Sequence, residues 1–263
     1  MTINIALRED SVLSRLQPQA PQYQDLMVSL AFAPEEVRES QRLRHRIFAE
    51  EMGARLNTSE PGLDIDDFDP YCQHVIVRDQ VTRQVVASTR VLLDTEARLA
   101  GGFYSESEFD IGRLRNEPGR IIEIGRTCVH PDYRSGTAIG LLWSGLARFI
   151  DIRQYRYMIG CASVAMGETG IAAQGVYEML KHKYLMPEAS RVIPKLPLPE
   201  RALSDAERQI KPPVPPLLKA YIRLGARIGG EPCWDPLFDC ADFLVVLSPV
   251  ELQRRYARRF LAV

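Results

Sequence analysis

Residues 123–143 read EIGRTCVHPDYRSGTAIGLLW. A β-branched apolar run leads into a loop that contains Pro131 and Gly136, and an amphipathic helix follows the loop. A strand that turns into a helix in this way offers free backbone N–H groups and the positive end of the helix dipole. The pattern indicates a site for an anion, such as a phosphate or a developing oxyanion. The alternative is a plain strand-to-helix connection.

The composition around this unit is that of an ordinary globular protein. The chain has 263 residues, of which 46% are hydrophobic and 25% are charged. The formal net charge of −1 gives no basic excess, so we expect no nucleic-acid partner. Five scattered cysteines without a Cys-x-x-Cys pair, and four unpaired histidines, favour reduced thiols and no metal site.

The sequence shows no signal for export or membrane insertion. Arg8, Glu9 and Asp10 stand where a signal peptide is apolar, and no run of about 18 apolar residues occurs. We therefore expect a cytoplasmic protein, with peripheral contact at the inner membrane face as an open alternative. Residues 1–22 are expected to form a flexible arm before a single domain over 23–263.

Strand and helix signals alternate along the rest of the chain. The order predicts one α/β domain with a mixed central sheet and helices on both faces. Residues 94–119 have no regular pattern, and eight prolines within 186–216 predict an extended flap. Strands are predicted at 25–32, 74–78, 85–93, 120–129, 157–162 and 242–247, and helices at 34–52, 137–152, 170–182, 217–226 and 251–260.

Two charged side chains interrupt apolar strands and need either a buried partner or a ligand. Arg90 stands between apolar residues, and Glu123 lies among isoleucines, which should raise its pKa. In a regular strand Glu123 and Arg126 would point to opposite faces. We predict a bulge near Gly125 that turns both side chains toward one cleft.

The quoted loop resembles the acyl-donor signature of the GNAT superfamily of N-acyltransferases through Val129, Pro131, Tyr133 and Arg134. The resemblance implies a GNAT-like fold, with backbone N–H groups near Val129 polarising a thioester carbonyl. The loop is one residue shorter than usual, which suits the single phosphate of an acyl carrier protein. That protein is thus the implied partner, and its acyl-phosphopantetheine is a co-substrate, with no cofactor bound permanently. The implied donor-binding residues are Val129, Arg134, Ser135, Gly136 and Thr137.

The spacing of a second set of residues resembles the layout of the acyl-homoserine lactone synthases. This set is Arg44, Phe48, Glu51, Asp64, Asp66, Asp69, Arg90, Glu123 and Arg126. The resemblance suggests Glu123 as general base, with Glu51 as the alternative. Arg90 and Arg126 would orient carboxylates, either of the substrate or of the acid-rich loop 57–73, which is called the aspartate loop. In the same hypothesis, Asp66 and Asp69 of this loop receive the cationic end of the substrate. The implied catalytic residues are Glu123, Glu51 and Arg126, and the implied substrate-binding residues are Arg44, Phe48, Asp66, Asp69, Arg90 and Ser163.

Residues 125–150, 157–164 and 215–247 are similar to the family of L-ornithine Nα-acyltransferases. The similarity runs from about residue 25 to 260. It implies transfer of a (3-hydroxy)acyl group from acyl carrier protein to the α-amine of ornithine, giving lyso-ornithine lipid. Glycine or lysine as acceptor, a homoserine-lactone synthase that uses S-adenosylmethionine, and a non-catalytic binder of carrier protein or lipid remain alternatives.

Several patterns carry a weaker signal. The stretch from His74 to Asp79 matches a short glycerolipid-acyltransferase pattern, which we interpret as chance. Ser163 lacks the Gly-x-Ser-x-Gly context of a hydrolase nucleophile. Two arginine clusters favour either a solvated face, an acidic lipid surface or an acidic carrier protein. These arginines are Arg148, Arg153, Arg156, Arg254, Arg255, Arg258 and Arg259.

Overall fold

Alternating burial along the strands builds a sheet that must be covered on both faces. In strand β2 (Gln73–Asp79), Val75 and Val77 belong to one apolar core and Ile76 to another, and all three are fully buried. The computed structural model describes residues 25–149, 154–166, 170–199, 212–236 and 238–249. The predicted arm 1–22, the closing helix 251–260, Arg153 and the flap residues 200–211 lie outside the described residues.

The main sheet has the strand order β1-β2-β3-β5-β6-β10-β8, and β9 pairs with β10. Its neighbours are antiparallel except β5 and β6, which are parallel, so the predicted mixed sheet is confirmed. A second sheet pairs β4 with β7. The strands are β1 Leu26–Leu30, β2 Gln73–Asp79, β3 Val85–Leu93, β4 Phe109–Asp110, β5 Arg120–Val129, β6 Tyr155–Ala165, β7 Ile193–Pro194, β8 Arg227–Ile228, β9 Cys233–Asp235 and β10 Cys240–Leu247.

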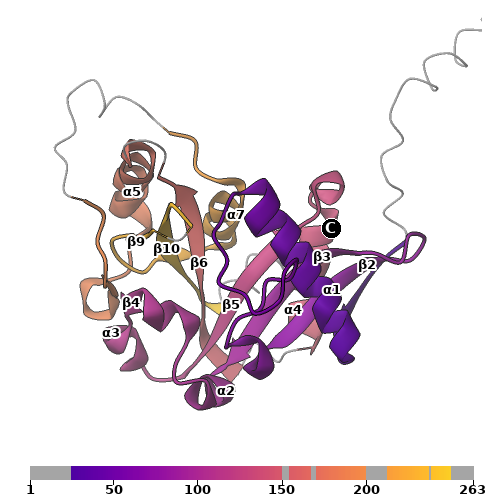
Figure 1. The fold of residues 1–263 in the computed structure, drawn as a ribbon. Coiled ribbons are helices and arrows are strands. Elements are labelled where there is room, and N and C mark those ends of the chain that lie inside the picture. Colours follow the sequence, from indigo (N-terminus) through magenta and orange to yellow (C-terminus); the bar gives the residue numbers. More distant parts are fainter. Residues whose placement is uncertain (1–24, 150–153, 167–169, 200–211, 237, 250–263) are drawn as a thin grey trace, which may run out of the picture.

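Helices cover both faces of the sheet, as predicted (Figure 1). Leu43 of α1 packs with Ile76, whereas Leu142 and Leu146 of α4 pack in the core that contains Val75 and Val77. Since neighbouring residues of a strand face opposite sides, α1 and α4 lie on opposite faces. The α-helices are α1 Pro34–His45, α2 Asp94–Leu99, α3 Gly112–Arg115, α4 Thr137–Phe149, α5 Ile171–Tyr184 and α7 Pro216–Leu224.

Three segments differ from the sequence-based expectation. The helix expected over 34–52 ends as α-helix at His45 and continues as a π-helical stretch, Arg46–Glu51. Residues 94–119 hold α2, α3, β4 and a 3-10 turn at Tyr104–Ser107. The described start of the proline-rich flap is packed onto the domain, because Met186 and Val192 are buried there. Among the described residues, no helix is long and apolar enough to cross a bilayer.

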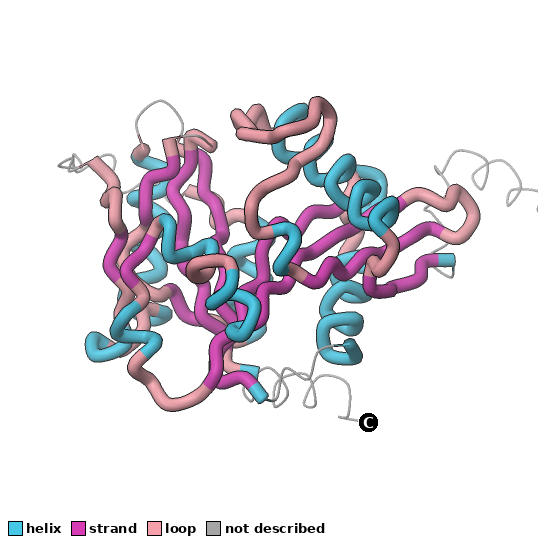
Figure 2. The backbone as a smooth tube through the Cα atoms, turned by 60° about the horizontal axis from the view of Figure 1, so that its bottom comes forward, coloured by secondary structure: helices cyan, strands magenta, loops and turns pink. Residues whose placement is uncertain are grey.

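Strands β5 and β6 are paired over only part of their length. Their pairs run from Arg120–Tyr155 to Glu123–Ile159, and the strands part beyond that point. Figure 2 shows the resulting two groups of strands, which run in different directions. At the parting point a Cβ on Gly160 would lie 2.2 Å from the carbonyl oxygen of Ile124, so only glycine allows this close approach. Side chains beyond it can face a cavity.

Candidate active site

Strand β5 contains a bulge at the place where the cavity begins. Ser88 of β3 pairs with Cys128, but Arg90 pairs with Gly125, so β5 has one extra residue in this interval. Arg126 takes up the distortion with a left-handed φ of 50°. The bulge predicted near Gly125 is therefore confirmed, and both Glu123 and Arg126 line one cavity.

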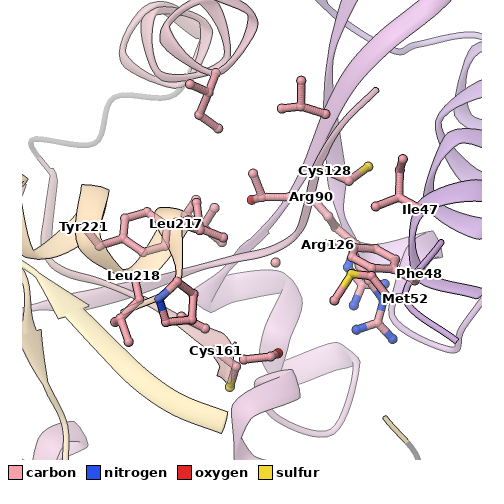
Figure 3. Close-up of a pocket in the computed structure, with 18 of the residues that line it drawn as sticks. Ile47, Phe48, Met52, Arg90, Arg126, Cys128, Cys161, Leu217, Leu218 and Tyr221 are labelled. Atoms are coloured by element: carbon pink, nitrogen blue, oxygen red, sulfur yellow. The ribbon is translucent and has the colours of Figure 1, made fainter. Parts of the chain in front are cut away.

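The cavity between the parted strands has a volume of about 670 Å³. Charged and polar side chains of β3, β5, β6 and β10 line part of it, and apolar side chains of the π-helical stretch and α7 line another part, which is called the apolar arm. In Figure 3, Arg90 and Arg126 are drawn on the same side of the cavity as Phe48 and Met52, and Leu217 and Tyr221 of α7 are drawn on the other side. The apolar arm is lined by Ile47, Phe48, Met52, Ile139, Leu217, Leu218 and Tyr221.

Three arginines and three aspartates form a buried ion-pair network beside the charged part of the cavity. Arg44 is completely buried and donates to Asp64 and to Asp69, each at 2.7 Å. The other two arginines each contact two aspartates and also reach the cavity. Burial acts to raise the pKa of Asp69, but Arg44 and Arg90 outweigh it and hold that pKa well below its usual range. The network consists of Arg44, Arg90, Arg126, Asp64, Asp66 and Asp69.

This pairing decides between the roles that the sequence left open. Asp66 and Asp69 direct their carboxylates to arginines, and neither lines the cavity, so they are not placed to receive a substrate's cationic end. Arg90 and Arg126 orient the aspartate loop, which is one of the two alternatives predicted for them. Arg44 also lies outside the cavity lining and holds the loop from behind. The formal charges of the network sum to zero, so its carboxylates are already paired without a ligand.

Glu123 is a buried carboxylate that lines the cavity at the last residue pair between β5 and β6. Its Oε2 accepts the N–H of Tyr104 at 2.6 Å and its Oε1 accepts the N–H of Ser105 at 2.8 Å. Burial raises the pKa of Glu123 although these hydrogen bonds lower it, which agrees with the direction expected from the neighbouring isoleucines. A carboxylate offers about four lone-pair positions, so capacity remains for a water or an amine.

Glu51 and Arg134 pair at the exposed rim of the cavity. Arg134 donates to both carboxylate oxygens of Glu51, at 2.6 and 2.7 Å, and this lowers the pKa of Glu51. A carboxylate with a lowered pKa is the weaker base, so geometry and charge favour Glu123 over Glu51. Arg134 also donates from Nε to the carbonyl of Val129 at 3.0 Å.

The donor loop presents part of its predicted residue set to the cavity. Val129, Arg134 and Gly136 line it, whereas Ser135 and Thr137 are not among the lining residues. Gly136 has a φ of 108°, which L side chains rarely adopt, and it leads directly into α4. The N-terminus of a 13-residue helix therefore stands at this side of the cavity.

Sequence reasoning missed two buried acids at the cavity. Asp242 lines it with 4% of its surface exposed, and Glu108 is 9% exposed behind Cys161. Ser163 donates to Asp242 at 2.6 Å, so the predicted substrate residue Ser163 does lie on the cavity. Glu108 lies in the stretch 94–119, where no regular pattern indicated its surroundings. Asp242 could have been found, because a charged residue at the start of an apolar strand indicates that it needs a partner or a ligand. Asp242, Glu108 and Asp235 are called the acidic cluster below.

Ligand atoms of Asp235, Cys240 and Asp242 lie within 4.8 Å of one another, which is a spacing that a metal ion would accept. Burial raises the pKa of the Cys240 thiol, which favours its protonated form. The Cys240 Sγ contacts the Asp242 carboxylate at 3.7 Å. Asp235 and Asp242 of this group belong to the acidic cluster, and Cys240 lies against it.

The fold is similar to that of N-acyltransferases. A model of the acetyltransferase (GNAT) domain matches residues 43–144. An N-acyl amino acid synthase from uncultured soil microbes superposes with a TM-score of 0.54 at 12% identity, covering 89% of this chain and 98% of its own. A CoA-dependent acyl-homoserine lactone synthase gives 0.53 at 15% identity, covering 89% of each chain. The chain has the fold of the GNAT N-acyltransferases.

Sequence comparison narrows this class. The L-ornithine Nα-acyltransferase of Rhodobacter capsulatus is 33% identical over 246 residues, covering 87% of this chain and 92% of that protein. The enzyme of the same name from Brucella abortus is 33% identical over 254 residues, covering 88% and 87%. That from Agrobacterium fabrum is 35% identical over 249 residues, covering 88% and 83%. The chain belongs to the family of L-ornithine Nα-acyltransferases.

Proposed function

We propose that this protein transfers a (3-hydroxy)acyl group from acyl carrier protein to the α-amino group of L-ornithine, giving lyso-ornithine lipid. The observation that carries the proposal is the cavity, whose lining combines charged side chains with an apolar arm in a chain of this family. Such a lining accommodates an amino acid at the charged side chains and an acyl chain in the apolar arm. The thioester carbon then lies where β5 and β6 part.

The reaction requires a neutral amine, a polarised carbonyl and close approach of the two. In our proposal Glu123 takes a proton from the α-ammonium, either directly or through a water. The amine nitrogen then attacks the thioester carbon, and the C–N bond forms as the C–S bond breaks. After attack the nitrogen gives up a second proton, which protonates the departing thiolate, and the proton held by Glu123 is released to solvent. The edge of β5 beyond Glu123, where pairing with β6 has ended, supplies N–H groups near Val129 for the oxyanion.

The donor side supports a phosphopantetheine arm. Gly136 and the following helix N-terminus offer backbone N–H groups, and Arg134 adds a positive charge at the rim. This set suits one phosphate, as the arm of an acyl carrier protein carries. Met52 is 58% exposed beside the apolar arm, which supports peripheral contact of this rim with a membrane when the lipid product leaves.

A substrate panel tests the proposal. The full chain is incubated with 3-hydroxyacyl carrier protein and, separately, with ornithine, lysine, glycine or S-adenosylmethionine, and products are identified by mass. We expect acyl-ornithine at the highest kcat/KM. A lactone as the main product would assign the chain to the homoserine-lactone synthases, and carrier binding without any product would make it a non-catalytic binder. The same donor as a coenzyme A thioester is expected to react more slowly.

A further inference from the structure

We propose that Asp242 determines the acceptor amino acid by binding its side-chain ammonium, with the charge of Glu108 reinforcing it from behind the cavity wall. This inference rests on the proposed function and deepens it. It identifies the residue that distinguishes a diamino acid from amino acids with neutral side chains.

The polar partners of the two carboxylates are neutral donors. Asp242 accepts from the hydroxyl of Ser163 at 2.6 Å and lies 3.7 Å from the Cys240 thiol. Glu108 accepts from the Cys161 thiol at 3.2 Å and from the Tyr104 hydroxyl. Within the described part of the chain, no lysine or arginine forms an ion pair with Asp242 or Glu108.

Asp242 and Glu108 differ in this respect from the aspartates of the neighbouring arginine–aspartate network. Asp64, Asp66 and Asp69 are matched by three arginines, so that region is already neutral. Arg126 is a cation whose charge acts on Asp242 and lowers its pKa, but Arg126 forms its ion pairs with Asp64 and Asp66. Buried carboxylates without a cation are costly, and they persist where a ligand supplies the missing charge. The cavity is the route by which that charge reaches Asp242.

The position within the cavity fits an acceptor that carries two amines. Glu123 and Asp242 line the same cavity from β5 and β10, which flank β6 on its two sides. An amino acid with its α-amine at Glu123 can thus extend its side chain toward Asp242. Glycine has no side chain to reach the acidic cluster, and norleucine brings a methyl group where ornithine brings an ammonium.

Protonation should modulate this recognition. Burial raises the pKa of Asp242 and of Glu108, and repulsion between them adds to the effect for Glu108. Only the ionised carboxylate attracts an ammonium, so preference for ornithine should rise with pH. The titratable or charged groups that face this pair are Tyr104 of the 3-10 turn, Arg126 of β5, Cys161 of β6, Asp235 of β9 and Cys240 of β10.

The test compares ornithine with norleucine, which has the same side-chain length without the charge. For wild type, Asp242→Asn and Glu108→Gln, kcat/KM is measured for both acceptors with one acyl carrier protein donor between pH 6 and 9. We expect Asp242→Asn to lower the ornithine-to-norleucine ratio at least about tenfold and to flatten its rise with pH. Glu108→Gln should lower the ratio less. Asp110→Asn, an exposed change near Glu108, is the matched control.

The possible results separate this inference from the function on which it rests. If wild type acylates ornithine and folded Asp242→Asn keeps the wild-type ratio, the inference is wrong and the proposed function stands. If wild type acylates neither acceptor, the proposed function fails. Calorimetric titration with ornithine and norleucine then still tests the recognition, because equal affinity for both would overturn it. If Asp242→Asn does not fold, an unchanged ratio in Glu108→Gln overturns the supporting role of Glu108, and the calorimetric comparison on wild type decides the rest.

Discussion

We expect Glu123→Gln to lower kcat for acyl transfer at least about 100-fold, the loss that removal of a general base usually causes. Glutamine keeps the size of the side chain and one acceptor for the backbone N–H groups of Tyr104 and Ser105, but it cannot take up a proton. The variant's unfolding midpoint is measured alongside, because its amide also faces a backbone donor. A fully folded variant with wild-type kcat would contradict the role of Glu123.

The pH profile separates a catalytic role from a structural one. Because burial raises the pKa of Glu123, the free enzyme should lose kcat/KM as the pH falls through that raised pKa, at a higher pH than an ordinary glutamate would give. Glu123→Gln should remove this acidic limb. The matched control is Glu51→Gln at the exposed rim, where Arg134 lowers the carboxylate pKa. We expect that variant to keep the limb, and the opposite pattern would make Glu51 the base.

Arg44→Met is expected to give the largest loss of stability, about 3–5 kcal/mol in the free energy of unfolding. Arg44 is fully buried, and its removal leaves Asp64 and Asp69 without the cation that both contact at 2.7 Å. Urea denaturation at pH 7 measures the loss. Arg38→Met, which breaks the exposed pair with Glu60, is the control and should change stability little.

The sign of the pH effect gives a second readout for Arg44. Because arginines hold the folded-state pKa of Asp69 below its usual value, this carboxylate stabilises the wild type above the unfolded pKa, and the stabilisation is lost as the pH falls. The gap between wild type and Arg44→Met should therefore narrow in acid. A gap that stays constant as the pH falls through the ordinary carboxyl range, from about pH 5 to about pH 2, would show that lost packing, and not lost charge pairing, causes the destabilisation.

The sequence predicted those features that depend on local pattern. Alternating apolar residues indicated the central strands, and a charged pair in strand 120–129 required the bulge that Arg126 now shows. The partners of the charged groups could not be predicted in this way. An arginine in a strand indicates that it needs an anion, but whether Asp66 or a substrate supplies it depends on how a distant loop packs.

The acidic cluster shows the same limit more strongly. Glu108 follows a short 3-10 turn in a stretch without periodicity, and Asp242 belongs to β10, so more than 100 residues separate them. They meet because β10 pairs with β6, which carries Cys161 and Ser163 against both acids. Such a cluster depends on strand order across the sheet, which a single sequence does not specify residue by residue.

The central claim is that the α-nitrogen of ornithine receives the acyl group while the side-chain ammonium is held among carboxylates. Fragmentation mass spectrometry of the product made from ornithine labelled with ¹⁵N at the α-position tests it most directly. We predict that the amide nitrogen is ¹⁵N and that the terminal amine remains free and unlabelled. An unlabelled amide, formed at the side-chain nitrogen, would contradict both the placement of Glu123 beside the α-amine and the binding of the side-chain ammonium at Asp242.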